Sequence, residues 1–339
     1  MDPDAPDSTD ASPELVAPSV RALLHDIVDY AGYFPPADLP LAEALRNYAE
    51  YRAEPEAWML SRFVVPVALL PDLMPHQALF KQGEPFMFSV LGTGGETSDA
   101  FLGAFSNDLD RIETFHEQHR ERARADAMEV PLPAPLVEAP MAEGLDFLEQ
   151  VHRQLVTTGT AALDLFLEVP AAGATVDILA PLCAAVAEHN SRQRMPNRST
   201  VGLKIRCGGR EPADVPAPAP VAAFIVACRN AGIRFKATAG LHHPVRHYDS
   251  HMETEMHGFL NLFGGAALAL EHDLGVDEVE AIVREEAGQA FQFEKDILRW
   301  RDLSVSMEPI DYARTDLAVS FGSCSFEEPI DDLRDMDLI

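Results

Sequence analysis

The chain has 339 residues, 47% of them hydrophobic, so it can bury a large core. It has 26 basic and 55 acidic residues, and its formal net charge is −29. This charge disfavours binding to nucleic acid and to anionic membrane surfaces, because both bind clustered cations. No run of eighteen apolar residues suggests a membrane span, and the start of the chain lacks the basic and apolar segments of a signal peptide. We therefore expect a cytoplasmic protein.

Lysine is scarce in this chain. Only four of the basic residues are lysines: Lys81, Lys204, Lys236 and Lys295. A lysine-poor, acid-rich surface suits a cytoplasm of high salt, where screening weakens self-repulsion, so the composition indicates halophilic adaptation. A lysine retained inside a strand of such a chain therefore points to a specific role.

The first part of the chain is expected to lie outside the main domain. Residues 1–13 are acidic and contain proline, which predicts a disordered tail. Residues 14–62 are expected to form an N-terminal helical extension, with helices over 19–31 and 40–53 separated by a turn at 32–36.

Residues 63–339 alternate short apolar runs with amphipathic stretches. The runs predict strands over 63–70, 86–91, 127–130, 163–169, 201–207 and 233–238, with 258–263 and 318–325 as candidates for the last two. Alternating strands and helices joined by short loops imply a parallel sheet, and about eight such units favour closure. The expected fold class is α/β, a single (β/α)8 TIM-type barrel with an N-terminal helical extension. The absence of GxGxxG after an early strand disfavours dinucleotide binding.

Four charged side chains are expected at the carboxyl ends of the strands, where barrels carry their functional groups. Glu129 and Glu168 close the third and fourth predicted strands, and each is followed two residues later by proline. Lys204 lies on the fifth predicted strand and Lys236 on the sixth. Helices cover the outside of a parallel sheet, so we expect both ammonium groups to point inward, with the glutamates as counterions. The alternative is an ion-paired lattice that fills the barrel top without chemistry.

Two neighbouring lysines have a chemical use. A nearby cation and an apolar setting lower the pKa of an amine, and a neutral amine can attack a carbonyl. The segment LKIRCGG, followed thirty-two residues later by FKATAGL, resembles the two lysine strands of deoxyribose-phosphate aldolases, which are barrel enzymes that form a Schiff base. That resemblance implies that Lys204 is the attacking amine and Lys236 the cation that tunes it.

The match to the aldolases has departures. The predicted strand count puts the lysines on the fifth and sixth strands, one earlier than in that family. The family's helping aspartate has no clear counterpart, although Glu129 or Asp164 is a substitute. The segment Leu241-His242-His243-Pro244 replaces the family's glycine-rich phosphate-binding turn.

A wider resemblance spans nearly the whole chain. The segments DYAGYFPPA, KIRCGG, KATAGLHHP and FGSCSFEEP, which begin at residues 29, 204, 236 and 321, look like the hallmarks of a family of uncharacterised bacterial and plant proteins. This resemblance implies a shared barrel fold and brings no reaction with it.

Five of the twelve histidines lie between 242 and 257. One hypothesis is a divalent metal held by His242 or His243 with Glu129 and Glu168. A second makes a histidine, His242 first, the general acid–base. A third is a solvated polar loop. No HxH or HExxH spacing is present, so the sequence specifies no cofactor.

Glycine-bearing loops after the strands can bind an anion through backbone N–H groups. Such loops are centred on Gly94-Gly95, Gly208-Gly209 and Gly322, and Arg206 or Arg210 can add a fork of donors. The expected substrate-binding residues are Arg206, Gly208, Gly209, Thr238, His243, Ser323 and Ser325.

The four cysteines are widely spaced, without a CxxC pair, and are read as reduced thiols. Cys207 and Cys324 fall near predicted strand ends.

These features predict a lyase or aldolase-like enzyme that acts on a small anionic carbonyl compound through a lysine Schiff base. The alternatives are a metal-dependent hydrolase or isomerase, and a barrel that binds a metabolite without turnover. A homo-oligomer is compatible with the sequence.

Overall fold

The computed structural model describes residues 16–81, 83–193 and 200–339, so the expected tail at 1–13 lies outside the described residues. Eight parallel strands close into a barrel in the order β1-β13-β7-β6-β5-β4-β3-β2. These strands are β1 (Val28–Tyr30), β2 (Leu60–Pro66), β3 (Phe86–Leu91), β4 (Ala123–Pro131), β5 (Asp164–Val169), β6 (Val201–Arg206), β7 (Phe235–Thr238) and β13 (Ala318–Ser323). The predicted (β/α)8 barrel is confirmed.

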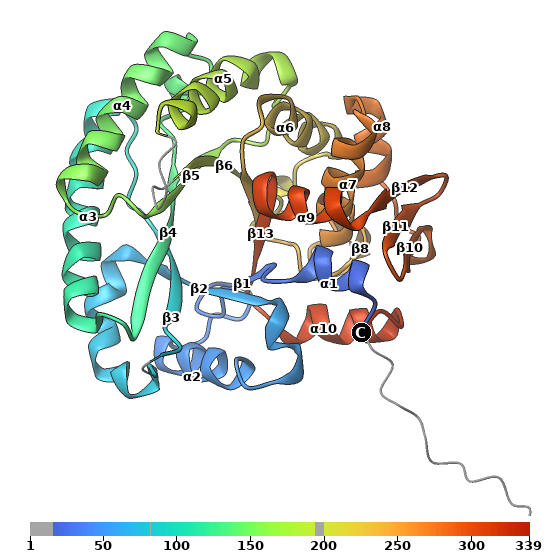
Figure 1. Cartoon of the computed structure of the whole chain (residues 1–339), viewed down its shortest axis with the longest axis horizontal. Helices are drawn as coiled ribbons and strands as arrows, with labels where there is room; N and C mark the ends of the chain where they lie inside the picture. Colours follow the sequence, from blue (N-terminus) through green and yellow to red (C-terminus); the bar gives the residue numbers. More distant parts are fainter. Residues whose placement is uncertain (1–15, 82, 194–199) are drawn as a thin grey trace, which may run out of the picture.

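Helices surround this ring (Figure 1). They are α1 (Pro18–Leu24), α2 (Leu41–Tyr51), α3 (Ser98–His119), α4 (Met141–Thr157), α5 (Val176–Arg192), α6 (Pro218–Ala231), α7 (Phe259–His272), α8 (Val276–Val283), α9 (Met307–Asp316) and α10 (Glu327–Asp335). Local signals fix several ends: the Thr97 and Thr175 side chains cap α3 and α5, and Gly232 ends α6 with φ of 63°. In the described part of the chain, no helix is long and apolar enough to cross a membrane.

Short elements complete the chain. The 3₁₀ segment Val67–Leu79 connects β2 to β3 where a helix would normally stand. A hairpin of β8 (His247–Asp249) and β9 (Thr254–Met256) follows β7, and a three-stranded antiparallel sheet of β10 (Phe291–Glu294), β11 (Ile297–Trp300) and β12 (Leu303–Ser306) precedes α9.

The N-terminal boundary of the barrel was predicted wrongly. Residues 14–62 are not only a helical extension, because they contain β1 and the start of β2. Helix α1 ends at Leu24, the backbone turns at Asp26 with φ of 49°, and Val28–Tyr30 then pairs with β2 on one side and β13 on the other. A strand of three residues is too short to show a period of two, so the apolar pattern was read as one helix.

The strand predicted at 258–263 is also wrong, because this segment begins α7. Its side chains are buried on every side of the helix, from Phe259 to Ala269. A short apolar run does not distinguish a buried helix from a buried strand. The two errors leave the number of barrel strands unchanged, because one strand is gained before β2 and one is lost after β7. The ordinal of each strand between them rises by one, so Lys204 lies on the sixth barrel strand and Lys236 on the seventh.

Candidate active site

The two lysines lie side by side inside the barrel. Lys204 and Lys236 are direct partners in the β6–β7 register, so their side chains leave the sheet on the same face. The side chains are only 6% and 1% exposed. Their immediate neighbours along the strands are fully buried on the opposite, helix-covered face: Leu203 and Ile205 beside Lys204, and Phe235 and Ala237 beside Lys236. The predicted inward orientation of both ammonium groups is confirmed.

Lys204 contacts both glutamates that the sequence predicted as counterions. Its Nζ lies 2.7 Å from Oε2 of Glu129 and 2.9 Å from Oε2 of Glu168. Burial alone would lower the pKa of Lys204, but the two carboxylates outweigh it and raise that pKa above its usual value. The expectation that the neighbouring cation leaves Lys204 as a free amine is therefore wrong for the resting site, where Lys204 is an ammonium group.

Lys236 is buried more deeply and is enclosed by polar groups from three other strands. Its Nζ lies 2.8 Å from Oδ2 of Asp29, 3.1 Å from Oγ of Ser89, and also contacts Oε1 of Glu129. Glu129 thus places one carboxylate oxygen on each lysine. The two ammonium groups hold the pKa of Glu129 well below its usual range, although burial opposes this shift.

Two serines complete the hydrogen bonding of the carboxylates. Ser89 Oγ donates to Oε1 of Glu129 at 2.7 Å, and Ser320 Oγ donates to Oδ2 of Asp29 at 2.5 Å. The backbone N–H of Arg62 donates to the other oxygen of Asp29 at 3.1 Å. The charges are therefore fixed in position by several strands at once. We call Asp29, Ser89, Glu129, Glu168, Lys204, Lys236 and Ser320 the lysine cluster.

Sequence reasoning missed Asp29, Ser89 and Ser320. The helix predicted over 19–31 includes Asp29, so the aspartate was not placed on a barrel strand beside the lysines. The signal that could have found it is the β-branched pair Ile27-Val28 directly before Asp29, which is typical of a buried strand.

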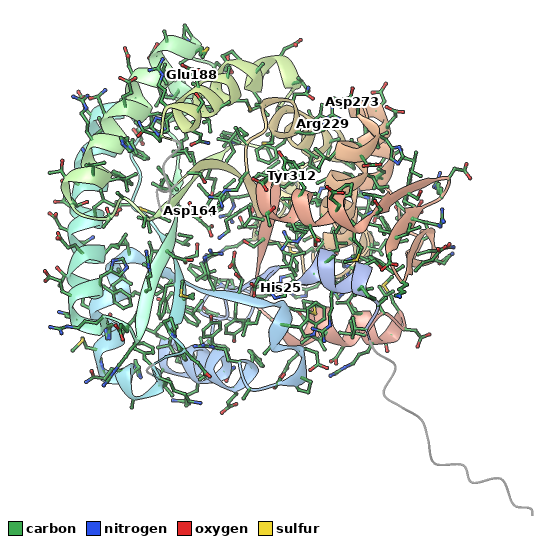
Figure 2. The ribbon with its side chains drawn as sticks, in the orientation of Figure 1. His25, Asp164, Glu188, Arg229, Asp273 and Tyr312 are labelled. Atoms are coloured by element: carbon green, nitrogen blue, oxygen red, sulfur yellow. The ribbon has the colours of Figure 1, made fainter. Side chains whose placement is uncertain are left out.

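Asp164, the other acid proposed as a substitute for the aldolase aspartate, does not join the lysine cluster. It lies at the start of β5 (Figure 2), where it pairs with Arg234 at 2.7 Å and accepts a hydrogen bond from the Thr200 N–H at 3.0 Å. Parallel strands begin at the end of the barrel opposite the mouth. That role for Asp164 was predicted wrongly.

A phenylalanine fills the barrel beneath the lysines. The Lys236 ammonium lies 5.4 Å from the centre of the Phe166 ring, and the Arg234 guanidinium lies 5.7 Å from it. The ring fits because residue 202 is glycine: a Cβ there would lie 2.8 Å from the ring and 2.6 Å from the Arg234 carbonyl oxygen. The lysine cluster thus rests on an apolar floor, and its most exposed side chain is that of Glu168, at 20%.

The histidines lie at the mouth but bind other partners. His242 Nδ1 lies 2.9 Å from Oε2 of Glu328, and His243 Nδ1 lies 2.5 Å from Oδ2 of Asp332; both acids belong to α10. Glu129 and Glu168 instead form ion pairs with the lysines. The metal set of His242 or His243 with Glu129 and Glu168 is therefore not assembled, and the described residues contain no group of three or more His, Cys, Asp or Glu arranged to hold a metal.

The glycine loop after β6 binds a carboxylate of its own chain. The N–H groups of Arg210 and Glu211 donate to Oδ2 of Asp214 at 2.8 and 3.0 Å. A Cβ at position 209 would lie 2.3 Å from the same oxygen. The loop has the shape expected for an anion, but Asp214 occupies it, so Gly208 and Gly209 do not present a free cradle.

The remaining predicted substrate-binding residues differ in whether their side chains are free to contact a ligand. Arg206 ends β6 and is exposed. The hydroxyl of Thr238, two residues after Lys236 on the same strand face, is buried without a hydrogen-bond partner among the described residues. Ser325 Oγ instead accepts from the Glu328 N–H at 3.1 Å, and Ser323 Oγ accepts from the Ser325 N–H at 3.3 Å, so both serines fix the start of α10.

No family model matches the chain, and no curated protein matches it. Among solved structures, it is similar to a protein described as a deoxyribose-phosphate aldolase from Toxoplasma gondii ME49, with 12% identity, a TM-score of 0.39, and 66% of this chain and 78% of that chain covered. It is also similar to a thermostable aldo-keto reductase bound to the inhibitor epalrestat, with 12% identity, a TM-score of 0.38, and 91% and 89% covered. The barrel itself is defined by the strand pairing of this chain.

Proposed function

We propose that the protein is a barrel enzyme of the lyase or aldolase kind, which acts on a small anionic carbonyl compound through a Schiff base at Lys204. The observation that carries the proposal is the pair of contacts that Lys204 makes with Glu129 and Glu168 at the open end of a buried cluster. Lys236 beside it is more completely enclosed, with a side chain 1% exposed against 6% for Lys204, so Lys204 is the lysine more accessible to a substrate that enters from the mouth.

The raised pKa of Lys204 has two opposite effects on this chemistry. It disfavours the neutral amine that attacks the carbonyl. It also favours the product of that attack, because a protonated imine carries the same positive charge as the ammonium group it replaces. The three carboxylates of Asp29, Glu129 and Glu168 exceed the two ammonium groups by one charge. The site is therefore complementary to the cationic imine.

The proton steps fall to Glu168. It contacts the Lys204 ammonium and is partly exposed, so it accepts the proton that frees the amine. The amine then adds to the carbonyl carbon, and water leaves as the imine forms. If a carbon–carbon bond is cleaved, the cationic imine accepts the electrons of that bond. The Glu168 carboxylate then removes the proton from the hydroxyl of the departing fragment.

The anionic group of the substrate must lie away from the excess negative charge. Arg206 and the hydroxyl of Thr238 stand at the ends of the two lysine strands, and they supply a cation and a free donor on that side. The substrate is therefore oriented with its carbonyl toward Lys204 and its anion toward Arg206.

Borohydride trapping tests the proposal. The protein is incubated with a panel of anionic aldehydes and 2-keto acids and then reduced, and modified peptides are identified by mass spectrometry. We expect an adduct at Lys204 that is lost in Lys204→Met and retained in Lys295→Met, since Lys295 is exposed in the turn before β11. Thermal stabilisation by a panel member without any adduct would instead support the non-catalytic binding barrel.

A further inference from the structure

A second group of reactive side chains lies at the mouth of the barrel, where β13 ends. Cys324 Sγ lies 3.8 Å from Nε2 and 3.9 Å from Nδ1 of His242. The same Nδ1 lies 2.9 Å from Oε2 of Glu328 and 3.4 Å from Oγ of Ser323. The three side chains stand in the order thiol, imidazole, carboxylate. This is the order of a nucleophile, its base, and the group that orients the base.

Charged and polar groups surround Cys324 in the turn between β13 and α10. Cys324 directly follows β13 and lies three residues before Glu327, the first residue of α10. Glu327 and Glu328 in the first turn of α10 and the Tyr30 hydroxyl on β1 also face this region.

The charge of His242 supports this geometry. Burial lowers the pKa of His242, but the contacts with Cys324 and Glu328 outweigh it and raise that pKa to about 9. The imidazole is therefore protonated at neutral pH. It offers the sulfur a cation and a proton for a leaving group.

The other three cysteines have no such surroundings. Burial raises the pKa of Cys207 to about 12. It also raises the pKa of Cys228, whose thiol contacts Cys183, well above its usual value. All three are at most 2% exposed, whereas Cys324 is 8% exposed. The chain thus contains one thiol at the mouth and three in the core.

We propose that Cys324, His242 and Glu328 form a nucleophilic thiol site that exchanges with small disulfides. The Cys324 thiolate attacks one sulfur of the disulfide, the S–S bond breaks, and the other sulfur leaves as a thiolate that takes the proton from His242. The products are a mixed disulfide on Cys324, a free thiol and a neutral imidazole. Because Glu327 and Glu328 adjoin the site, its ligands are neutral or cationic disulfides rather than anionic ones. The site does not depend on Lys204 chemistry.

The test uses the full chain and cystamine, a small disulfide with cationic ends, and follows adducts by mass spectrometry. We expect one adduct per chain, at Cys324, while the three core cysteines stay unmodified. At about pH 7, His242→Gln should slow the reaction by about tenfold, and near pH 10, where any exposed thiol ionises, the two rates should converge. His251→Gln, a change at an exposed histidine in the turn between β8 and β9, should react like the wild type.

Three results would overturn the thiol site. One is modification of all four cysteines only when the protein unfolds. Another is a folded His242→Gln variant that reacts at the wild-type rate at about pH 7. If that variant does not fold, the wild-type profile decides: a rate that keeps rising about tenfold per pH unit up to about pH 8.5 is that of an ordinary thiol. None of these results touches borohydride trapping at Lys204, so the two proposals fail separately.

Discussion

Lys204 and Lys236 are partnered residues on adjacent strands, and they bind opposite oxygens of one carboxylate, that of Glu129. Two cations at neighbouring positions would repel each other strongly in a buried setting. Glu129 removes much of that repulsion, and Asp29 and Glu168 each balance one lysine from the far side. The stability of the barrel interior therefore depends on Glu129 more than on either outer acid.

Glu129→Gln should lower the free energy of unfolding by about 3–5 kcal/mol, because it leaves two buried ammonium groups with less compensation. Denaturant unfolding followed by circular dichroism measures the change. Glu117→Gln, on the exposed face of α3, is the matched control and should shift stability by less than about 0.5 kcal/mol. An equal, small effect of both substitutions would contradict the role of Glu129.

Glu168→Gln should make Lys204 easier to deprotonate. Glu168 is one of the two carboxylates that raise the pKa of Lys204, and removing an opposite charge within 4 Å lowers an ammonium pKa by roughly 1 unit or more. Reductive methylation with formaldehyde across a range of pH, read at Lys204 by mass spectrometry, should show a midpoint at lower pH in the variant. Exposed Lys295 in the same sample provides the reference, and an unchanged difference between the two lysines would speak against this electrostatic coupling.

Gly202→Ala should destabilise the protein by about 1–3 kcal/mol, because the added methyl group meets the Phe166 ring and the Arg234 carbonyl. Gly103→Ala is the matched control. It lies exposed in α3 with open space around its Cβ position, and alanine there should stabilise the helix by about 1 kcal/mol. Thermal unfolding of both variants measures the contrast, and a neutral Gly202→Ala would mean that the floor of the site is not tightly packed.

His257 should make the protein less stable in mild acid. Burial lowers the pKa of His257 to about 4, and its Nε2 lies 2.8 Å from the Pro216 carbonyl oxygen. Below its ordinary pKa of about 6.5, the unfolded chain binds a proton that the folded chain does not, so this contribution is lost as pH falls from about 6.5 toward 4. His257→Gln should remove up to about 3 kcal/mol of that pH dependence. Denaturant unfolding at a series of pH values tests it, and parallel curves for wild type and variant would refute it.

The sequence predicted the parts of the barrel that have a strong local signal. The strands at 86–91 and 201–207 were predicted from short apolar runs. The inward orientation of Lys204 and Lys236 was predicted from the cost of an unpaired charge beneath a helix. What it could not predict depends on contacts distant in sequence. Asp29 reaches Lys236 only because the barrel closes, and the pKa of Lys204 depends on which carboxylates arrive beside it.

The loops after the strands were the least predictable part. A glycine-rich turn has the same local sequence whether it binds a ligand or a carboxylate of its own chain. Here the Asp214 carboxylate, a few residues downstream, accepts the backbone hydrogen bonds that a ligand would otherwise accept. The same holds for His242 and His243. Their partners lie on α10, more than eighty residues away, and nothing in the histidine-rich segment itself indicates acids there.

The seam between β1 and β13 has a consequence for biosynthesis. Val28 pairs with Phe321, so the barrel closes between two strands that are far apart in the sequence. During translation, β1 lacks this neighbour until the residues of β13 have left the ribosome. One edge of β1 therefore stays open while the intervening strands are made, and the ring and the Asp29–Lys236 ion pair are completed together.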